Sequence, residues 1–135
     1  METFSKRFVK FDNSDDYVPG TNKLDVDDNT TQYSSDAINV KHAKDGALAL
    51  FVNLDGATAA KRAVEIGYLI SHDGVTFIQP EGHTIYKNLK DPLNVADAAI
   101  EFSIPPCEQI KITVKGDSAN TDTNFKGNVG FYEKL

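Results

Sequence analysis

The side chains best placed for chemistry are oxygen-bearing residues between positions 25 and 36. Asp25, Asp27 and Asn29 occupy the first, third and fifth positions of a calcium-binding loop, and Asp36 falls at the twelfth. Hard oxygen ligands at alternate positions can wrap around a calcium ion. Thr30, however, stands where such a loop needs glycine, the twelfth position lacks the usual bidentate glutamate, and no helical pattern precedes the stretch. We therefore predict a solvated acidic loop with no bound metal.

The histidines and the single cysteine form no recognisable catalytic pattern. His42, His72 and His83 lack the spacing of zinc ligands. Cys107 follows two prolines and has no histidine close in sequence, so we predict a partly buried, small apolar side chain. The signatures of a serine triad, a glycine-rich phosphate loop and a paired-carboxylate glycosidase site are missing from the sequence. We therefore expect a non-enzymatic protein without a cofactor.

A short motif at residues 71–77, SHDGVTF, resembles a shortened form of the S-x-D-x-G-x-T-W hairpin of sialidase-type propellers. In that hairpin the serine and aspartate side chains stabilise a turn by bonding to the backbone. The motif occurs once here and is one residue short. It predicts a hairpin and gives no indication of glycan cleavage.

Charge and composition exclude two classes of partner. The formal net charge is -6, and the lysines and arginines are spread along the chain rather than gathered into a basic face. A protein that grips nucleic acid through phosphates needs such a face, so we expect no nucleic-acid binding. The N-terminal residues, METFSKRFVKFDNSDD, contain no apolar signal-peptide region, and no segment is long and apolar enough to span a membrane. We expect synthesis in the cytosol, which fits a cytoplasmic protein or a virion component assembled inside a host cell.

The elements that must position these residues are strands. Residues 47–78 predict three of them, joined by connections that contain Asp-Gly pairs, because such pairs tolerate the positive φ of tight hairpin turns. Alternating apolar residues in 47–54 indicate a central strand covered on both faces. The three strands within 47–78 are residues 47–54, 62–70 and 75–79. Further strands are predicted at residues 37–43, 83–86, 99–104, 109–115 and 127–133, and a helical turn at 91–96. About eight short strands at this spacing predict an all-β domain, an antiparallel β-sandwich or jelly-roll over residues 37–135.

Residues 1–36 differ in amino-acid composition from this domain. Phe4, Phe8 and Phe11 stand among basic residues, and residues 12–36 are rich in aspartate, asparagine, serine and threonine. A long polar stretch of this kind is typical of a functional or flexible loop, so we predict an extended N-terminal arm and acidic loop with one short strand near residues 23–26. The arm's aromatic side chains are expected to pack on the domain itself or on a neighbouring subunit.

The chain combines four segments: the polar N-terminal arm, the run YSSDAINVKHAKDGALALFVNLDG, the SHDGVTF hairpin and the segment IKITVKGD. This combination resembles small structural proteins of tailed bacteriophage virions, above all capsid decoration or auxiliary proteins. The resemblance implies a β-sandwich or jelly-roll, no cofactor, a location in the virion, and symmetric homo-oligomers such as trimers. It further implies that the protein binds and stabilises the shell of a major capsid protein. From the arm prediction, Phe4, Phe8 and Phe11 are the expected partner-binding residues.

Two other functions stay open. A carbohydrate- or receptor-binding β-sandwich of a fibre or adhesin would use the loops at residues 55–61, 79–91 and 116–125 to line its site. A hydrolytic enzyme would need a pocket with convergent carboxylates and a shifted pKa.

Overall fold

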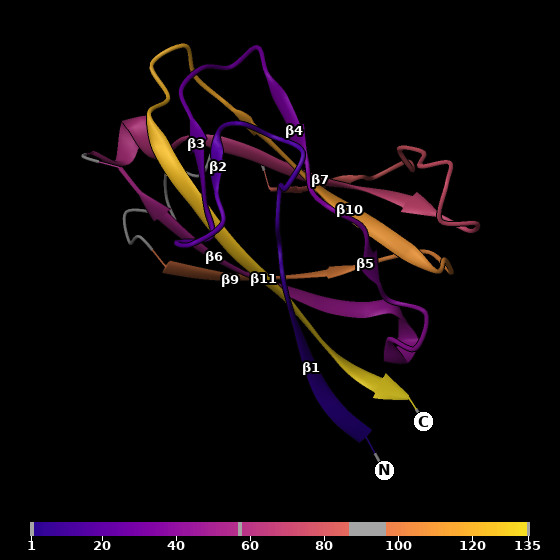
Figure 1. Cartoon of the computed structure of the whole chain (residues 1–135). Helices are drawn as coiled ribbons and strands as arrows, with labels where there is room; N and C mark the ends of the chain where they lie inside the picture. Colours follow the sequence, from indigo (N-terminus) through magenta and orange to yellow (C-terminus); the bar gives the residue numbers. More distant parts are fainter. Residues whose placement is uncertain (1, 57, 87–96, 135) are drawn as a thin grey trace.

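The chain forms two antiparallel β-sheets that share one hydrophobic core (Figure 1). The computed structural model describes residues 2–56, 58–86 and 97–134, and these contain eleven strands. The predicted all-β sandwich is therefore confirmed. In the described part of the chain, no helix has the length and apolar character needed to cross a lipid bilayer.

The six-stranded sheet has the order β2-β3-β11-β6-β9, and β1 also pairs with β11. Its strands are β1 (Glu2–Phe8), β2 (Tyr17–Val18), β3 (Lys23–Val26), β6 (Ala47–Asp55), β9 (Asp97–Ser103) and β11 (Thr123–Lys134). The five-stranded sheet has the order β4-β10-β7-β8, and β5 also pairs with β10. Its strands are β4 (Gln32–Ser34), β5 (Ile38–Asn39), β7 (Val64–Ser71), β8 (Thr84–Tyr86) and β10 (Gln109–Gly116).

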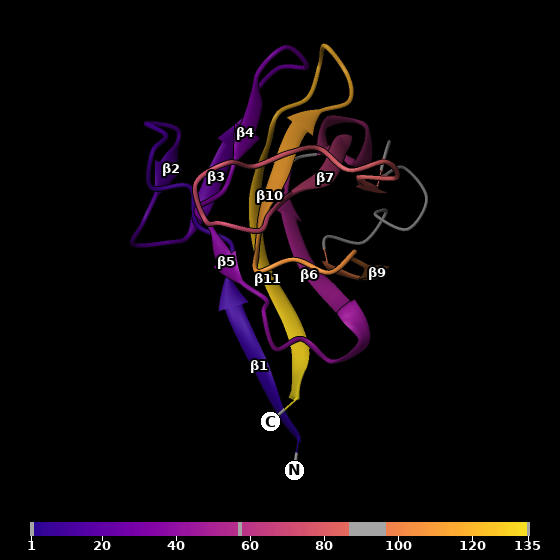
Figure 2. The same ribbon diagram turned by 90° about the vertical axis from the view of Figure 1, so that its right-hand side faces the viewer.

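Strand β11 organises the six-stranded sheet. Its residues 124–130 pair with β6 along one edge. Along the other edge, residues 123–125 pair with β3 and residues 128–134 pair with β1. In Figure 1 and in the view turned by 90° (Figure 2), β1 runs beside the last part of β11, toward the end of the molecule where both chain ends lie.

The alternation of apolar residues decides which faces are buried. Every second residue of β6 and of β10 points into the core, as the sequence predicted. The prediction that β6 is covered on both faces is wrong, because the residues of its other face are exposed or half-buried. These residues, with Val129 and Phe131 of β11, are among the most buried of the chain: Leu48, Leu50, Val52, Leu54, Ile110, Ile112 and Val114. The core therefore lies between the two sheets, and the other face of each sheet is left for solvent or partners.

The predicted hairpin across Asp55-Gly56 is wrong. β6 lies between β11 and β9 in one sheet, whereas β7 lies between β10 and β8 in the other. The connection therefore crosses between the sheets, through the 3-10 turn η2 (Ala59–Arg62). Gly56 does not have a positive φ. A Cβ atom there would lie 2.7 Å from Cγ of Arg62, so a larger residue would force the Arg62 side chain to shift.

Two smaller predictions had different outcomes. Residues 75–79 form no strand, and a single bridge between Ile70 and Ile78 joins them to β7. The predicted helical turn at residues 91–96 lies outside the described residues. A second 3-10 turn, η1 (Lys44–Gly46), leads into β6 at the predicted Asp45-Gly46 turn, with both of these residues at positive φ.

The predicted N-terminal arm is part of the sandwich rather than an extension from it. Residues 1–36 contribute β1, β2 and β3 to one sheet and β4 to the other. Val9 and Phe11 are almost fully buried, and the Phe11 ring stands edge-on to the Phe125 ring with 6.0 Å between centroids. The boundary predicted at residue 36 thus divides strands that share hydrogen bonds. Of these four strands only β3 was predicted. The polar character of residues 12–36 hid β2 and β4, and the seven-residue β1 was taken as part of the arm.

Candidate functional site

An exposed aromatic surface lies where β1 pairs with the end of β11. Phe4 and Tyr132 are directly opposite each other in the strand register, and their rings meet edge-on with 5.1 Å between centroids. Phe8, four residues after Phe4, projects from the same face of the strand. The exposed fractions are 45% for Phe4, 51% for Phe8 and 55% for Tyr132. We call these three residues the aromatic face.

The structure keeps two of the three predicted partner-binding residues at the surface and removes the third. Phe4 and Phe8 belong to the aromatic face, but Phe11 lies in the core and cannot contact a partner without unfolding. Sequence reasoning missed Tyr132. Its signal was present, because an aromatic residue follows the core residue Phe131 in a strand of alternating pattern and must therefore point outward.

A shallow apolar groove of about 370 Å³ adjoins the aromatic face. Phe4 and Tyr132 form one side of it, Glu101 lies on the other, and Gly130, Ala47 and Ala49 are among the residues lining it. A Cβ atom at Gly130 would stand 2.6 Å from Cζ of Phe4, so the Phe4 ring lies directly on the backbone there. Small side chains thus leave the sheet backbone close to the surface.

The outer face of the same sheet carries a second, more polar groove of about 750 Å³. Its lining includes the Phe51 ring together with Asn53, Asp97 and Asn128. The Asn53 amide donates a 2.8 Å hydrogen bond to the Asp97 carboxylate. The Lys6 ammonium lies 5.1 Å from the centre of the Phe51 ring. This groove combines an apolar ring with amide and carboxylate groups that can bond to hydroxyls.

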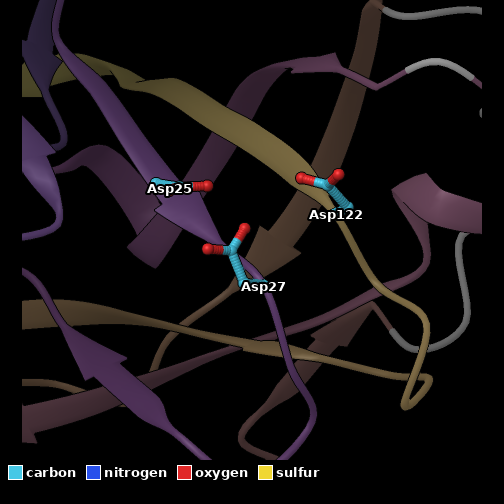
Figure 3. Close-up of side chains that lie close together, drawn as sticks. All are labelled: Asp25, Asp27 and Asp122. Carbon is cyan, nitrogen blue, oxygen red and sulfur yellow. The ribbon is translucent and has the colours of Figure 1, made fainter.

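Three aspartates meet at the other end of the six-stranded sheet (Figure 3). Asp25 and Asp27 come from β3 and the residue after it, and Asp122 precedes β11, the strand that pairs with β3. One carboxylate oxygen of each lies within 4.8 Å of the other two. We call these residues the acidic cluster. The sequence pattern named Asp25 and Asp27 but missed Asp122, which is 95 positions from Asp27.

The carboxylates of the acidic cluster disturb one another. A hydrogen bond with Asp25, partial burial and the repulsion of the Asp25 charge together raise the pKa of Asp27. All three side chains are exposed, and exposed acidic groups commonly gather without an ion. Asp36, the carboxylate at the twelfth position of the calcium-loop pattern, does not belong to the cluster. The absence of a bound metal therefore stays a prediction.

Two of the three loops expected for a ligand-binding module meet beside the acidic cluster. Residues 58, 60 and 61 and residues 119–122 line an open groove of about 700 Å³ with Asp25 and Asp27. The backbone N–H of Asp122 donates a 2.9 Å hydrogen bond to the carbonyl of Lys61. The third loop, residues 79–91, supplies no described residue to this groove, and its residues 87–91 lie outside the described ones.

The SHDG segment forms the predicted turn, although β-pairing beyond it is limited to one bridge. The Ser71 hydroxyl accepts hydrogen bonds from the N–H groups of Asp73 and Gly74. One Asp73 carboxylate oxygen accepts from the N–H groups of Val75 and Thr76, each at 2.9 Å. These backbone donors, from Thr76 first, lower the pKa of Asp73. The side chains stabilise the turn, which is the structural role that the sequence predicted for them.

The remaining candidate groups do not converge. Among the described residues, the acidic cluster is the one group of three or more possible metal ligands, and no histidine takes part in it. Cys107 is half-buried against the core, as expected, and burial raises the pKa of its thiol. A raised pKa keeps the thiol protonated, which is the less nucleophilic form.

Comparisons with known proteins support the fold. No family model and no curated protein matches the sequence. Among solved structures, the VP2 subviral particle of infectious bursal disease virus matches with a TM-score of 0.58 and 9% identity, over 98% of this chain and 32% of VP2. The SPBc2 prophage-derived protein YomS matches with a TM-score of 0.46 and 10% identity, over 96% of this chain and 95% of YomS.

A third similar structure is the chitosan-binding module 1 of a chitosanase/glucanase from Paenibacillus sp. IK-5. It has a TM-score of 0.44 and 9% identity, over 93% of each chain. The scores of YomS and of this module are too low to carry an argument. The VP2 match spans about a third of the viral protein, and at 9% identity it shows a shared two-sheet fold and nothing about function.

Proposed function

We propose that this chain is a non-enzymatic structural protein of a virus particle. In this role it would act as a capsid decoration or auxiliary protein that binds and stabilises the shell of a major capsid protein. The observation that carries the proposal is the aromatic face of Phe4, Phe8 and Tyr132, which are each about half exposed on paired strands. Exposed aromatic side chains that gather on one surface are typical of protein interfaces.

The aromatic face is held rigidly. All seven residues of β1 pair with β11, and a 3.2 Å ion pair between Arg7 and Glu133 links the two strands. Side chains that are already in place lose little conformational freedom when they bind, so more of the contact energy appears as affinity. For a protein that stabilises a shell, the paired strands β1 and β11 are therefore a more suitable binding surface than a flexible arm.

The surroundings of the aromatic face also fit a protein partner. The adjoining groove lets an apolar side chain of the partner pack against Ala47 and Ala49 beside the Phe4 ring. The charged residue Glu101 lines it, and Lys6 lies opposite Gly130, another lining residue, in the strand register. An apolar centre with a polar rim is the usual composition of protein interfaces. The fold that the chain shares with a viral capsid protein is compatible with this proposal.

The proposal is tested by co-sedimentation with empty shells assembled from a major capsid protein of the same genome. The double substitution Phe8→Ser and Tyr132→Ser is expected to weaken binding about tenfold or more, because exposed aromatic anchors dominate such interfaces. Val75→Ser is the matched control: Val75 is 83% exposed in the SHDG turn, outside the aromatic face, and its loss should leave binding unchanged. A folded double variant that saturates the shells like the unsubstituted protein would refute the proposal.

The polar groove favours a second candidate, a carbohydrate-binding module. The Phe51 ring offers an apolar surface, and Asn53, Asp97 and Asn128 offer donors and acceptors for sugar hydroxyls. A glycan array separates the two functions, since a shell-binding protein should give no selective signal. If a glycan does bind, Asn53→Ala and Asn128→Ala should each abolish the signal. A glycan signal that survives both substitutions would place the site elsewhere.

A further inference from the structure

We propose that two copies of this chain associate through the free edge of β1, antiparallel and around a two-fold axis, so that their six-stranded sheets become continuous. The inference does not depend on the proposed function, because it rests on the backbone and charges of one strand. Within the described residues β1 pairs with β11 on one side, and no strand lies against its other side. A seven-residue edge of this kind is a template for strand pairing.

The hydrogen-bond pattern shows which backbone groups are free. Val9, the residue after β1, donates a 2.9 Å hydrogen bond to the carbonyl of Gly127, which continues the β1–β11 register. Residues of an antiparallel pair alternate between bonding to the neighbour and facing away from it. Thr3, Ser5 and Arg7 therefore bond to β11. The N–H and carbonyl groups of the intervening residues face the free edge; these are Glu2, Phe4, Lys6 and Phe8.

The charges on β1 select one register for self-pairing. In a two-fold pair centred on Phe4, Phe4 faces Phe4 of the second copy, and Glu2 faces Lys6 twice, once on each side of the axis. A pair centred on Lys6 would oppose two ammonium groups, which is unfavourable. A pair centred on Ser5 would leave Glu2 opposite the apolar ring of Phe8. Glu2 also forms an ion pair with Lys44 of its own chain, so a contact between Glu2 and Lys6 of the second copy would share or replace that pair. Of the three arrangements, only the first places Glu2 and Lys6, the charged residues at the free edge, opposite each other.

The same arrangement covers exposed apolar surface. Phe4, 45% exposed, would stand at the two-fold axis against the Phe4 ring of the second copy. Aromatic cross-strand pairs are among the more favourable contacts in sheets. Each ring also keeps its edge-on contact with Tyr132 of its own chain.

A lysine at a sheet edge ordinarily prevents pairing with another strand, since few strands offer an opposite charge at the matching position. Lys6 therefore prevents the edge of β1 from pairing with most other strands. A second copy of β1 is an exception because its Glu2 reaches the matching position. The charges therefore both block unspecific edge pairing and permit self-pairing, which is how a specific dimer avoids becoming an aggregate.

Charge reversal tests the register. Sedimentation equilibrium of the unsubstituted protein at low salt should give twice the 14.8 kDa chain mass. Glu2→Lys alone and Lys6→Glu alone should each weaken dimerisation about tenfold or more, because each places like charges opposite one another on both sides of the axis. An equimolar mixture of the two variants should dimerise again, since opposite charges then face each other. Lys41→Glu, a charge change of the same size away from β1, should have no effect.

Amide hydrogen exchange provides the second measurement. On dimerisation the amides of Phe4 and Lys6 should become protected as concentration rises, whereas those of Ser5 and Arg7 should be protected at every concentration. A protein that stays monomeric up to about millimolar concentration would overturn the inference. So would a dimer that the mixed variants fail to restore, or one in which the Phe4 and Lys6 amides exchange freely.

Discussion

At the scale of single residues, two aspartates in exposed positions have opposite effects on stability. Asp73 accepts backbone hydrogen bonds in the SHDG turn, and its pKa is lowered from the ordinary value of 3.8. Asp27 stands against Asp25 in the acidic cluster, and its pKa is raised from the same value. The turn could be read from the sequence because all its partners lie within five residues. The cluster could not, because Asp122 reaches it only through the pairing of β11 with β3.

Asp73→Asn is expected to lower the melting temperature at pH 7. A carboxylate with a lowered folded-state pKa stabilises the fold above its unfolded-state pKa, and this contribution is lost as the pH falls through the folded value. The difference between the variant and the unsubstituted protein should therefore shrink at acidic pH, below about 3.8. Thermal unfolding at pH 7 and at pH 2.5 checks this, and an equal difference at both would contradict it.

Asp27→Asn is expected to raise the melting temperature at pH 7 by about 1 to 2 °C, whereas Asp73→Asn lowers it. The increase is small because solvent screens exposed charges. A raised folded-state pKa means that ionisation costs more in the folded protein, so the penalty grows as the pH rises from below 3.8 to above the folded value. Asp15→Asn, an exposed aspartate outside the cluster, controls for the change in net charge. A gain equal to that of the control would show that the cluster is not the cause.

At the scale of elements, β1 illustrates what a spacing of aromatic residues can and cannot predict. Phe4, Phe8 and Phe11 are separated by four and three residues, a spacing that also suits a helical face. In a strand the spacing of four keeps Phe4 and Phe8 on one face, while Phe11 lies beyond the strand where the chain turns into the core. The central strands β6 and β10 could be predicted because alternation is a local signal. Which sheet they join is set by contacts between distant residues, so the hairpin prediction failed.

Phe11→Ala is expected to destabilise the fold by about 3 to 5 kcal/mol, since it opens a cavity beside Phe125 in the core. Phe8→Ala removes a ring from the same segment, but one that is half exposed, and should change the free energy of unfolding by about 0.5 kcal/mol or less. Urea unfolding of both variants gives the comparison. Similar losses would mean that Phe8 is more buried than this structure shows. For the same reason, deleting residues 1–11 would damage the core and cannot test partner binding.

At the scale of the whole molecule, both sheets draw strands from residues 1–36 and from the rest of the chain. Fold class followed from composition and strand spacing, whereas the division into an arm and a domain followed from the polarity of residues 12–36. That polarity comes from the turns around the short edge strands β2 and β4 and from β4 itself, whose side chains mostly face solvent. Strand β2 is the pair Tyr17–Val18 and is too short to show an alternating pattern. Polar surface strands and polar loops have similar compositions, so the sequence could not separate them.

The protein is therefore expected to unfold in a single cooperative transition. Far-ultraviolet circular dichroism follows the sheets, and tyrosine fluorescence, in a chain without tryptophan, follows Tyr17 and Tyr33 of the first 36 residues together with the other tyrosines. The two signals should give the same midpoint. An earlier transition seen by fluorescence alone would show that residues 1–36 melt as a separate unit.

The pairing of β11 also determines when the protein can fold during its synthesis. A ribosome makes β1, β3 and β6 long before it makes residues 123–134, yet all three pair with that strand. Until then the six-stranded sheet has no centre, and Phe4, Phe8 and the free backbone of β1 stay open to any protein nearby. The nascent chain is therefore most prone to unspecific association before β11 is made, while these groups are exposed. We expect it to need either rapid completion or a chaperone that covers the N-terminal strand.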